Sequence, residues 1–286
     1  MLLGIQVSTA GGICESIPRA QALGCTAMQI FARDPRQWRK ASLKKSDIDE
    51  FRLRRQSSGI KKVFIHIPYL INLASPEHGL FRGSISACAQ DMREARALGA
   101  ECMVIHMGSH KFSGEKRGLK KLATALNRIL ELTAGSGVRI LLENTAGSGS
   151  WLGYTFDHHA AVLDRVEQKD RVGVCLDTCH AYAAGYDLAS KAGYDRLMDE
   201  IDRMVGVKRL ELIHLNDTRD ALGSHRDRHE HIGKGKIGIA GFSRIVGDRR
   251  LEHAACVLET PKDSATADER NLLIVRRLMH RAARKG

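Results

Sequence analysis

Three features that mark other classes of protein are missing from this sequence of 286 residues. No apolar run approaches the ~20 residues that a membrane-spanning helix needs. The opening stretch, MLLGIQVSTAGG, has no basic segment and too short an apolar run for a signal peptide. The seven cysteines are an odd number, and most lie within apolar runs (Cys102, Cys175 and Cys256), as expected of reduced core thiols and not of a disulfide framework. We therefore expect a cytoplasmic protein that does not bind membranes.

Acidic residues are in deficit. Asp and Glu number 33 against 45 Lys and Arg, which gives a formal net charge of +12 and a pI near 9.5. An enzyme of small metabolites has no need of this excess, whereas nucleic acid is the commonest polyanion that would use it. Since many basic proteins bind no nucleic acid, the charge needs support from the motifs.

Eight short runs rich in Val, Ile, Leu and Met predict the strands of one sheet. Their hydrophobicity is nearly continuous, which is typical of parallel strands buried on both faces. The runs cover residues 2–7, 27–31, 62–67, 102–106, 138–143, 172–177, 210–215 and 254–259. Segments with helical periodicity lie between them, and three of these stop before Gly99, Gly135 and Gly206, since glycine suits a helix C-terminus.

These units predict an α/β protein whose residues 1–286 form a single (β/α)8 TIM barrel, with the active site at the C-terminal ends of the strands. No linker rich in Gly, Ser or Pro divides the chain. An open doubly wound sheet is the alternative. It is less favoured because no G-x-G-x-x-G follows the first run, and the local pair Gly11-Gly12 lacks that spacing.

Side chains of metal-ligand type end six consecutive predicted strands. A single such side chain at a strand end would be explained as a hydrogen-bonded histidine or a capping carboxylate. Six in register converge on one mouth of a barrel, where burial is costly unless the groups are paired or coordinated. These strand-end residues are His66, His106, Glu143, Asp177, His214 and Glu259. Three further donors follow in the loops, namely His180, Asp227 and His229.

The nine nitrogen and oxygen donors suit zinc, manganese or iron. They are too many for one four-coordinate ion, so we expect a cluster of two or three ions with a bridging carboxylate. Cys179 could compete as a ligand, but thiolate sites usually come as Cys-x-x-Cys pairs, and Cys175 and Cys179 are spaced differently. Clustered divalent ions generate hydroxide at neutral pH and stabilise both oxygens of an in-line displacement, which predicts phosphodiester chemistry.

Several long stretches resemble the signatures of the endonuclease IV family, the zinc-dependent apurinic/apyrimidinic endonucleases of base-excision repair. They are GVCLDTCHAYAAGYD (173–187), HLND (214–217), DRHEHIG (227–233), LENTAG (142–147), YLIN (69–72) and RQW (36–38). The resemblance covers essentially the whole chain. It implies a (β/α)8 barrel that hydrolyses the phosphodiester 5′ to an abasic site in double-stranded DNA, leaves a 3′-hydroxyl and a 5′-deoxyribose phosphate, and also trims blocked 3′ ends. We expect the chain to act as a monomer.

The resemblance also implies a site with three zinc ions, in which manganese could replace part of the zinc. Glu143 would be the catalytic residue that bridges two ions. The sets carried over by motif are His66, His106 and Glu143 for one zinc, Glu143, Asp177, His214 and Glu259 for a second, and His180, Asp227 and His229 for the third. The sequence departs from the family at Gln6, where histidine is common, and at Lys234, where glutamate is usual.

The resemblance further implies residues that read the lesion. A damaged nucleotide must rotate out of the stack, and apolar wedges commonly fill such gaps. Tyr69 and Leu70, just past the third predicted strand, are the candidate wedge, and Arg36, past the second, could stack or contact phosphate. These residues could instead pack their loops onto the rim of the barrel.

Two other functions remain open from the residues. A divalent-metal sugar isomerase on the same barrel also uses Glu, Asp and His at strand ends, but usually with fewer ligands and a lysine in the site. A non-catalytic barrel that binds nucleic acid could hold a structural metal, although structural zinc sites are usually four-coordinate and rich in cysteine.

Overall fold

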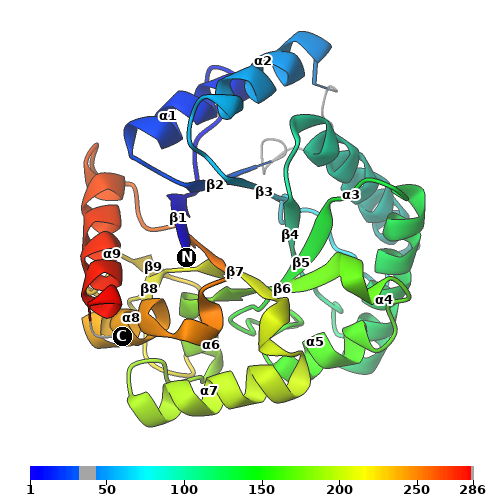
Figure 1. Cartoon of the computed structure of the whole chain (residues 1–286). Helices are drawn as coiled ribbons and strands as arrows, with labels where there is room; N and C mark the ends of the chain where they lie inside the picture. Colours follow the sequence, from blue (N-terminus) through cyan, green and yellow to red (C-terminus); the bar gives the residue numbers. More distant parts are fainter. Residues whose placement is uncertain (32–42, 285–286) are drawn as a thin grey trace.

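A computed structural model describes residues 1–31 and 43–284 of the chain. Its main sheet has eight parallel strands in the order β1-β10-β7-β6-β5-β4-β3-β2. The strands are β1 (Leu2–Ile5), β2 (Ala27–Phe31), β3 (Lys62–His66), β4 (Cys102–His106), β5 (Arg139–Glu143), β6 (Val172–Asp177), β7 (Leu210–His214) and β10 (Ala255–Leu258). The strands lie in a ring with helices around it (Figure 1), as predicted for a TIM barrel.

The barrel closes between its first two strands. Gln6, just past β1, forms an isolated parallel bridge with Gln29 in β2, and the backbone N–H of Val7 donates to the carbonyl of Gln29 at 2.8 Å. Below them, the N–H of Thr26 donates to the carbonyl of Leu3 at 2.8 Å. We call this line of contact the β1–β2 seam. The predicted run 2–7 forms a regular strand only as far as Ile5, because Gln6 pairs through this single bridge.

Helices cover the outside of the ring. They are α1 (Ser16–Ala22), α2 (Lys45–Gln56), α3 (His78–Leu98), α4 (Glu115–Leu132), α5 (Phe156–Leu163), α6 (Thr178–Ala184), α7 (Lys191–Met204), α8 (Gly238–Gly247) and α9 (Ala267–Ala283). The helix α3 ends where predicted, before Gly99, whose left-handed φ of 76° closes the last turn. A short antiparallel hairpin, β8 (Asp217–Thr218) and β9 (His229–Glu230), lies in a stretch that we had expected to be an irregular polar loop. In the described part of the chain, no helix is both long and apolar enough to span a bilayer.

The strands separate two apolar layers. One layer packs strand side chains against helices, and it includes Val63 and Ile65 of β3. The other contains strand residues alone and therefore fills the interior of the barrel; it includes Phe64 of β3 and Val104 of β4. Because side chains alternate along a strand, the residue two positions beyond each interior residue also points inward. His66 and His106 follow Phe64 and Val104 in this way, so the polar strand-end residues lie above the interior apolar layer.

Gly4 determines how closely the two strands of the β1–β2 seam approach. A Cβ atom on Gly4 would lie 1.8 Å from the backbone oxygen of Ala27. We therefore expect Gly4→Ala to lower the free energy of unfolding by at least ~2 kcal/mol, the scale of overpacking, because a backbone carbonyl cannot move aside as a side chain can. Thermal and urea unfolding would measure the loss.

Gly83 provides the matched control, since it lies exposed within α3 and nothing stands within 4 Å of the position of its Cβ. Gly83→Ala should be neutral or stabilising by up to ~1 kcal/mol, because alanine is the better helix former. Equal effects of the two substitutions would contradict the close approach at the seam.

Candidate metal centre at the mouth of the barrel

All nine predicted donor residues meet at the C-terminal ends of the strands. Five of them end strands, Glu259 directly follows β10, α6 supplies His180, and Asp227 lies just before β9, whose first residue is His229. They form three groups, and within each group the donor atoms lie within 4.8 Å of one another. The first group is His66, His106 and Glu143, the second is Glu143, Asp177, His214 and Glu259, and the third is His180, Asp227 and His229.

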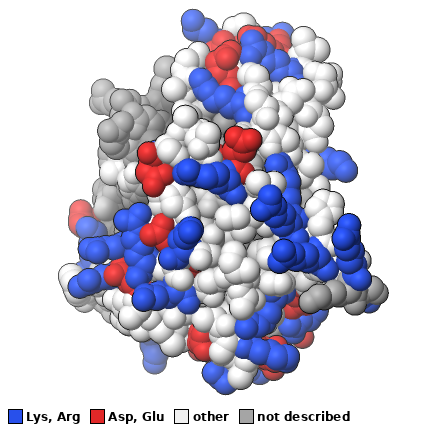
Figure 2. Space-filling view, turned by 90° about the vertical axis from the view of Figure 1, so that its left-hand side faces the viewer, with Lys and Arg blue, Asp and Glu red and all other residues white. Residues whose placement is uncertain are grey.

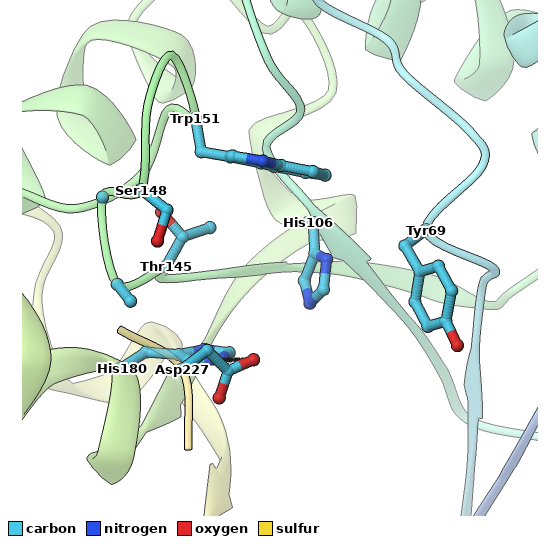
Figure 3. Close-up of a pocket in the computed structure, with 9 residues that line it drawn as sticks. Tyr69, His106, Thr145, Ser148, Trp151, His180 and Asp227 are labelled. Carbon is cyan, nitrogen blue, oxygen red and sulfur yellow. Dashed lines mark ion pairs between the residues drawn. The ribbon is translucent and has the colours of Figure 1, made fainter. Parts of the chain in front are cut away.

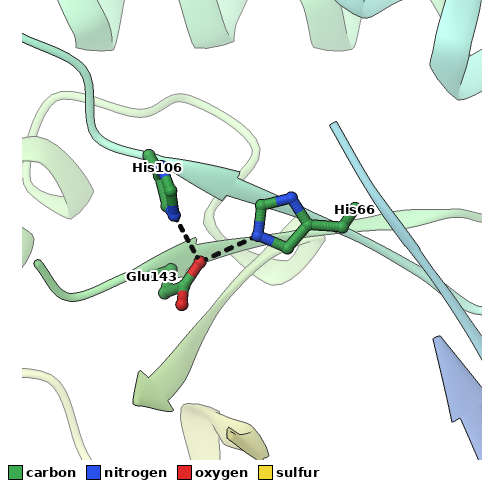
Figure 4. Close-up of side chains that lie close together, drawn as sticks. All are labelled: His66, His106 and Glu143. Carbon is green, nitrogen blue, oxygen red and sulfur yellow. Dashed lines mark hydrogen bonds and ion pairs between the residues drawn. The ribbon is translucent and has the colours of Figure 1, made fainter. Parts of the chain in front are cut away.

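Glu143 belongs to two of the groups because its two oxygens face opposite ways. The Nε2 atoms of His66 and His106 both lie 3.0 Å from its Oε2 atom (Figure 4). Its Oε1 atom lies 2.9 Å from Nδ1 of His214. The carboxylate is 1 % exposed, so it has almost no contact with water. This geometry is that of a carboxylate able to bridge two cations.

In the third group, Asp227 resembles Glu143 in that each of its two carboxylate oxygens faces a different imidazole. Its Oδ2 atom lies 3.1 Å from Nε2 of His180, and its Oδ1 atom lies 3.1 Å from Nε2 of His229. Unlike Glu143, the Asp227 side chain is 53 % exposed. The third group therefore faces solvent, while the second is closed over by protein.

Hydrogen bonds to carbonyl oxygens fix the orientation of three rings. The Nδ1 atoms of His66, His180 and His229 donate to the backbone carbonyls of Ile67, Asn144 and Glu259, at 2.7, 2.9 and 2.8 Å. A carbonyl only accepts, so each Nδ1 carries the proton and each Nε2 is left with a lone pair that faces a carboxylate. Backbone carbonyls commonly hold metal-binding histidines in this way.

Lone pairs that face carboxylate oxygens repel unless a proton or a metal cation lies between them. Burial alone would lower the pKa of His229, but the neighbouring Asp227 carboxylate raises that pKa to about 9. Burial likewise opposes the charge of Glu143, yet the imidazoles of His214 and His106 hold the pKa of this carboxyl well below its ordinary range. The buried Nε2 of His229 makes no hydrogen bond although Asp227 is close. The three groups therefore fit divalent cations, which would take the place of these protons.

The nearby thiols are less suited to bind a metal. Cys175 lies within 4.8 Å of donors of Glu143 and His214, and Cys179 lies as close to Asp177 and His229. Burial raises the pKa of Cys175 to about 12 and raises that of Cys179 as well, so both remain protonated at neutral pH. Because the thiolate is the form that binds metal, the nitrogen and oxygen donors are favoured.

Two asparagines that our sequence interpretation did not single out hold the second group in place. Asn144 donates from Nδ2 to the backbone oxygen of Asp177 at 3.1 Å and accepts from the backbone N–H of Asp177 at 2.7 Å. Asn216 donates from Nδ2 to Oδ2 of Asp177 at 2.6 Å and accepts from the N–H of Glu259 at 2.8 Å. Asn144 follows Glu143 by one residue and Asn216 follows His214 by two. Their position just past predicted strand-end donors is the feature of the sequence that could have identified them.

Asp217, a buried carboxylate outside the nine donors, holds the loop that follows β9. Its two oxygens accept hydrogen bonds from the backbone N–H groups of Gly233, Gly235 and Ile237, each at 2.9 to 3.0 Å. Lys234 lies in this loop and is exposed, so lysine in place of the family's usual glutamate leaves the loop anchored.

An open cavity of about 340 Å³ lies beside the first and third groups (Figure 3). Tyr69, which is 52 % exposed, and Trp151 stand on either side of His106 at its wall. Trp151 makes an edge contact with the ring of His106, at 5.9 Å between centroids, and was not among our predicted residues. Leu70 is half-buried on the same loop as Tyr69. The third predicted DNA contact, Arg36, lies outside the described residues.

Comparisons with known proteins agree with this architecture. A family model described as a xylose isomerase-like TIM barrel matches residues 17–279. A curated relative from Chloroflexus aggregans, named probable endonuclease 4, is 42 % identical over 277 residues, which are 96 % of this chain and 97 % of the relative. The crystal structure of endonuclease IV from Thermus thermophilus superposes with a TM-score of 0.87 at 37 % identity, covering 98 % of this chain and 100 % of that one.

The barrel is also shared with sugar-converting proteins. A D-tagatose 3-epimerase-like protein superposes with a TM-score of 0.75, covering 100 % of this chain and 98 % of that one. Its identity is only 17 %, so this similarity concerns the fold alone. The relatives at about 40 % identity span nearly the full length, as the resemblance in the motifs predicted. The chain therefore belongs to the endonuclease IV family.

Proposed function

We propose that this chain is a DNA-repair endonuclease that hydrolyses the phosphodiester 5′ to an abasic site in duplex DNA with a cluster of three zinc ions. The products would be a 3′-hydroxyl and a 5′-deoxyribose phosphate, and the same site would trim blocked 3′ ends. The observation that carries the proposal is the buried Glu143, whose two oxygens each face a separate set of donors beside an open cavity. When bound there, divalent ions lower the pKa of water and neutralise charge on the phosphodiester oxygens.

The residues around this centre have distinct parts in the reaction. Glu143 and the rings fixed by backbone carbonyls keep the donors in place before the DNA arrives, so that no reorganisation is needed during reaction. Asp227, which is the most exposed of the donor carboxylates, and His106 line the cavity and lie where an extruded phosphodiester would enter. The aromatic side chains of Tyr69 and Trp151 flank His106 at the wall of this cavity.

The charge of the molecule suits a polyanion. Figure 2 shows the face on which α9 lies, where Lys and Arg cover more of the surface than Asp and Glu do. Near the mouth, Lys234 and Lys236 are exposed on the loop that Asp217 anchors. Such charge supports the part of DNA binding that does not depend on sequence, and it makes that part sensitive to salt.

A sugar isomerase remains the alternative, because its fold is shared. Among the described residues that line the cavity there is no lysine, and the three groups offer more donors than a single-metal isomerase uses. Incubation with an abasic-site duplex and with a ketose–aldose pair, each with and without chelator, separates the two functions. We expect nicking that chelator abolishes and no sugar conversion; the reverse pattern would overturn the proposal.

We expect about three zinc-type ions per chain in protein never exposed to chelator, some of them replaceable by manganese. Elemental analysis of the purified protein measures this number. Asp227→Ala should lower it to about two, because the third group then keeps two imidazoles and no carboxylate. A parental protein with no more than one tightly held ion would contradict the cluster.

We expect Glu143→Gln to keep the fold but to lower nicking of abasic DNA at least ~10²-fold, since the neutral amide cannot bridge two cations. Single-turnover kinetics and circular dichroism would check both parts. Glu131→Gln, on the exposed face of α4, removes the same charge far from the mouth and should leave the rate unchanged. Parental activity of Glu143→Gln would show that Glu143 has no such role.

We expect the double substitution Tyr69→Ala and Leu70→Ala to weaken binding to abasic duplex by ~1–3 kcal/mol, the scale of one or more lost stacking contacts. Binding to undamaged duplex, which depends mainly on phosphate contacts, should change little. Titrations with both duplexes, together with metal content and melting temperature, would measure this. Leu53→Ala, an exposed leucine on α2, is the control for loss of apolar surface. Equal losses on both duplexes, or a large fall in melting temperature, would instead indicate that the pair supports its loop.

A further inference from the structure

A pair of glutamines on the β1–β2 seam reaches the second donor group. Gln6 and Gln29 face each other across the isolated bridge that closes the barrel. Gln29 follows Ala27 of the interior layer by two residues, so its side chain points into the barrel. Gln29 is 0 % exposed, and a buried amide of this kind is costly unless its polar atoms are paired.

Every polar atom of the Gln29 side chain has a partner. Its Nε2 atom donates to Oε1 of Glu259 at 2.7 Å and to Oε1 of Gln6 at 2.8 Å. Its Oε1 atom lies 2.9 Å from Nε2 of His214. The carboxylate of Glu259 only accepts hydrogen bonds, which fixes the NH2 group of Gln29 toward it and the oxygen toward His214.

The amide therefore determines the tautomer of His214. Because an amide oxygen only accepts, Nε2 of His214 must carry the proton and donate it to Gln29. Nδ1 is then left with the lone pair, and it lies 2.9 Å from Oε1 of Glu143 and 3.4 Å from Oε2 of Glu259. In His66, His180 and His229 a backbone carbonyl fixes which ring nitrogen carries the proton. In His214 the side-chain amide of Gln29 fixes it.

The same amide also orients the carboxylate of Glu259. With Oε1 held by Gln29, the free Oε2 atom of Glu259 is the one directed at His214. Gln6 in turn holds Gln29, since its Oε1 takes the second amide hydrogen while its own Nε2 is buried without a hydrogen bond. One side chain thus orients two donors of the second group.

We propose that Gln29 is a positioning residue, held by Gln6, that fixes the ring of His214 and the carboxylate of Glu259 for the second cation. This inference rests on the proposed metal-dependent function. Gln29 lies in the wall of the barrel and does not line the cavity, so it acts on the substrate only through these two donors. Residues that hold ligands in this manner typically contribute ~10- to 100-fold to metal affinity or activity.

The test uses Gln29→Met, which has a similar size and shape but makes none of the three hydrogen bonds. Metal-free protein is titrated with Zn²⁺ against a competing chelator, and its melting temperature is recorded with and without Zn²⁺. We expect one of the three ions to bind ~10- to 100-fold more weakly. The metal-free melting temperature should fall, because buried groups of Gln6, His214 and Glu259 lose a partner, and the increase caused by Zn²⁺ should become smaller as well. In nicking assays kcat should fall and KM for abasic duplex should stay nearly constant.

Two further variants separate positioning from general stability. Gln6→Met should have a smaller effect in the same direction, because Gln29 keeps its bonds to His214 and Glu259. Tyr194→Phe removes a partly buried hydrogen bond to Asp248 at 2.8 Å far from the mouth, and should leave zinc affinity unchanged.

The possible outcomes distinguish the two proposals. If the parental protein binds three ions and Gln29→Met binds all three with parental affinity, the positioning role is wrong and the proposed function stands. A lower metal-free melting temperature with an unchanged zinc-dependent increase would also overturn it, because Gln29 would then only stabilise the seam. A parental protein that binds at most one ion would overturn the proposed function itself.

Discussion

The buried charge of Glu143 is the constraint on which the mouth of the barrel depends. A carboxylate with 1 % exposure has lost its hydration and requires positive charge on both oxygens. Two imidazoles on one side and one on the other meet this need only if protons or cations lie between them. The hydrogen bonds to Ile67 and Asn144 carbonyls direct the lone pairs of His66 and His180 inward. The polar layer is thus arranged around the buried carboxylate of Glu143, which needs protons or cations beside it to balance its charge.

Much of this layer could be predicted from the sequence because the alternation of a strand is regular. His66, His106 and Glu143 each end a run that is apolar on both faces, so their direction followed once the runs were assigned to parallel strands. The closed ring of eight parallel strands and the family were likewise predicted and are confirmed. That the donors hold zinc, and how many ions, remains a prediction, as do the roles of Tyr69 and Leu70.

What the sequence did not reveal depends on contacts between distant segments. Gln29 is one polar residue in the apolar run AMQIF, and its role depends on Glu259 and His214, which are 230 and 185 residues away. Trp151 gave no signal, since its place beside His106 is set by how the segment after β5 folds back. Short-range patterns indicate which way a side chain points; they do not indicate which partner from another strand will be opposite it.

The pairing of the first strand with the last has a consequence for the order of folding. Leu2 is in register with Ala255, so β1 gains its second neighbour only after nearly the whole chain has been synthesised. Contacts so distant in sequence carry a large entropic cost and form late. Glu259 immediately follows that last strand, so until it docks, the acidic and imidazole groups of the earlier strands remain open to water. A nascent chain on the ribosome therefore has eight of the nine donors before the last strand docks and completes the second group.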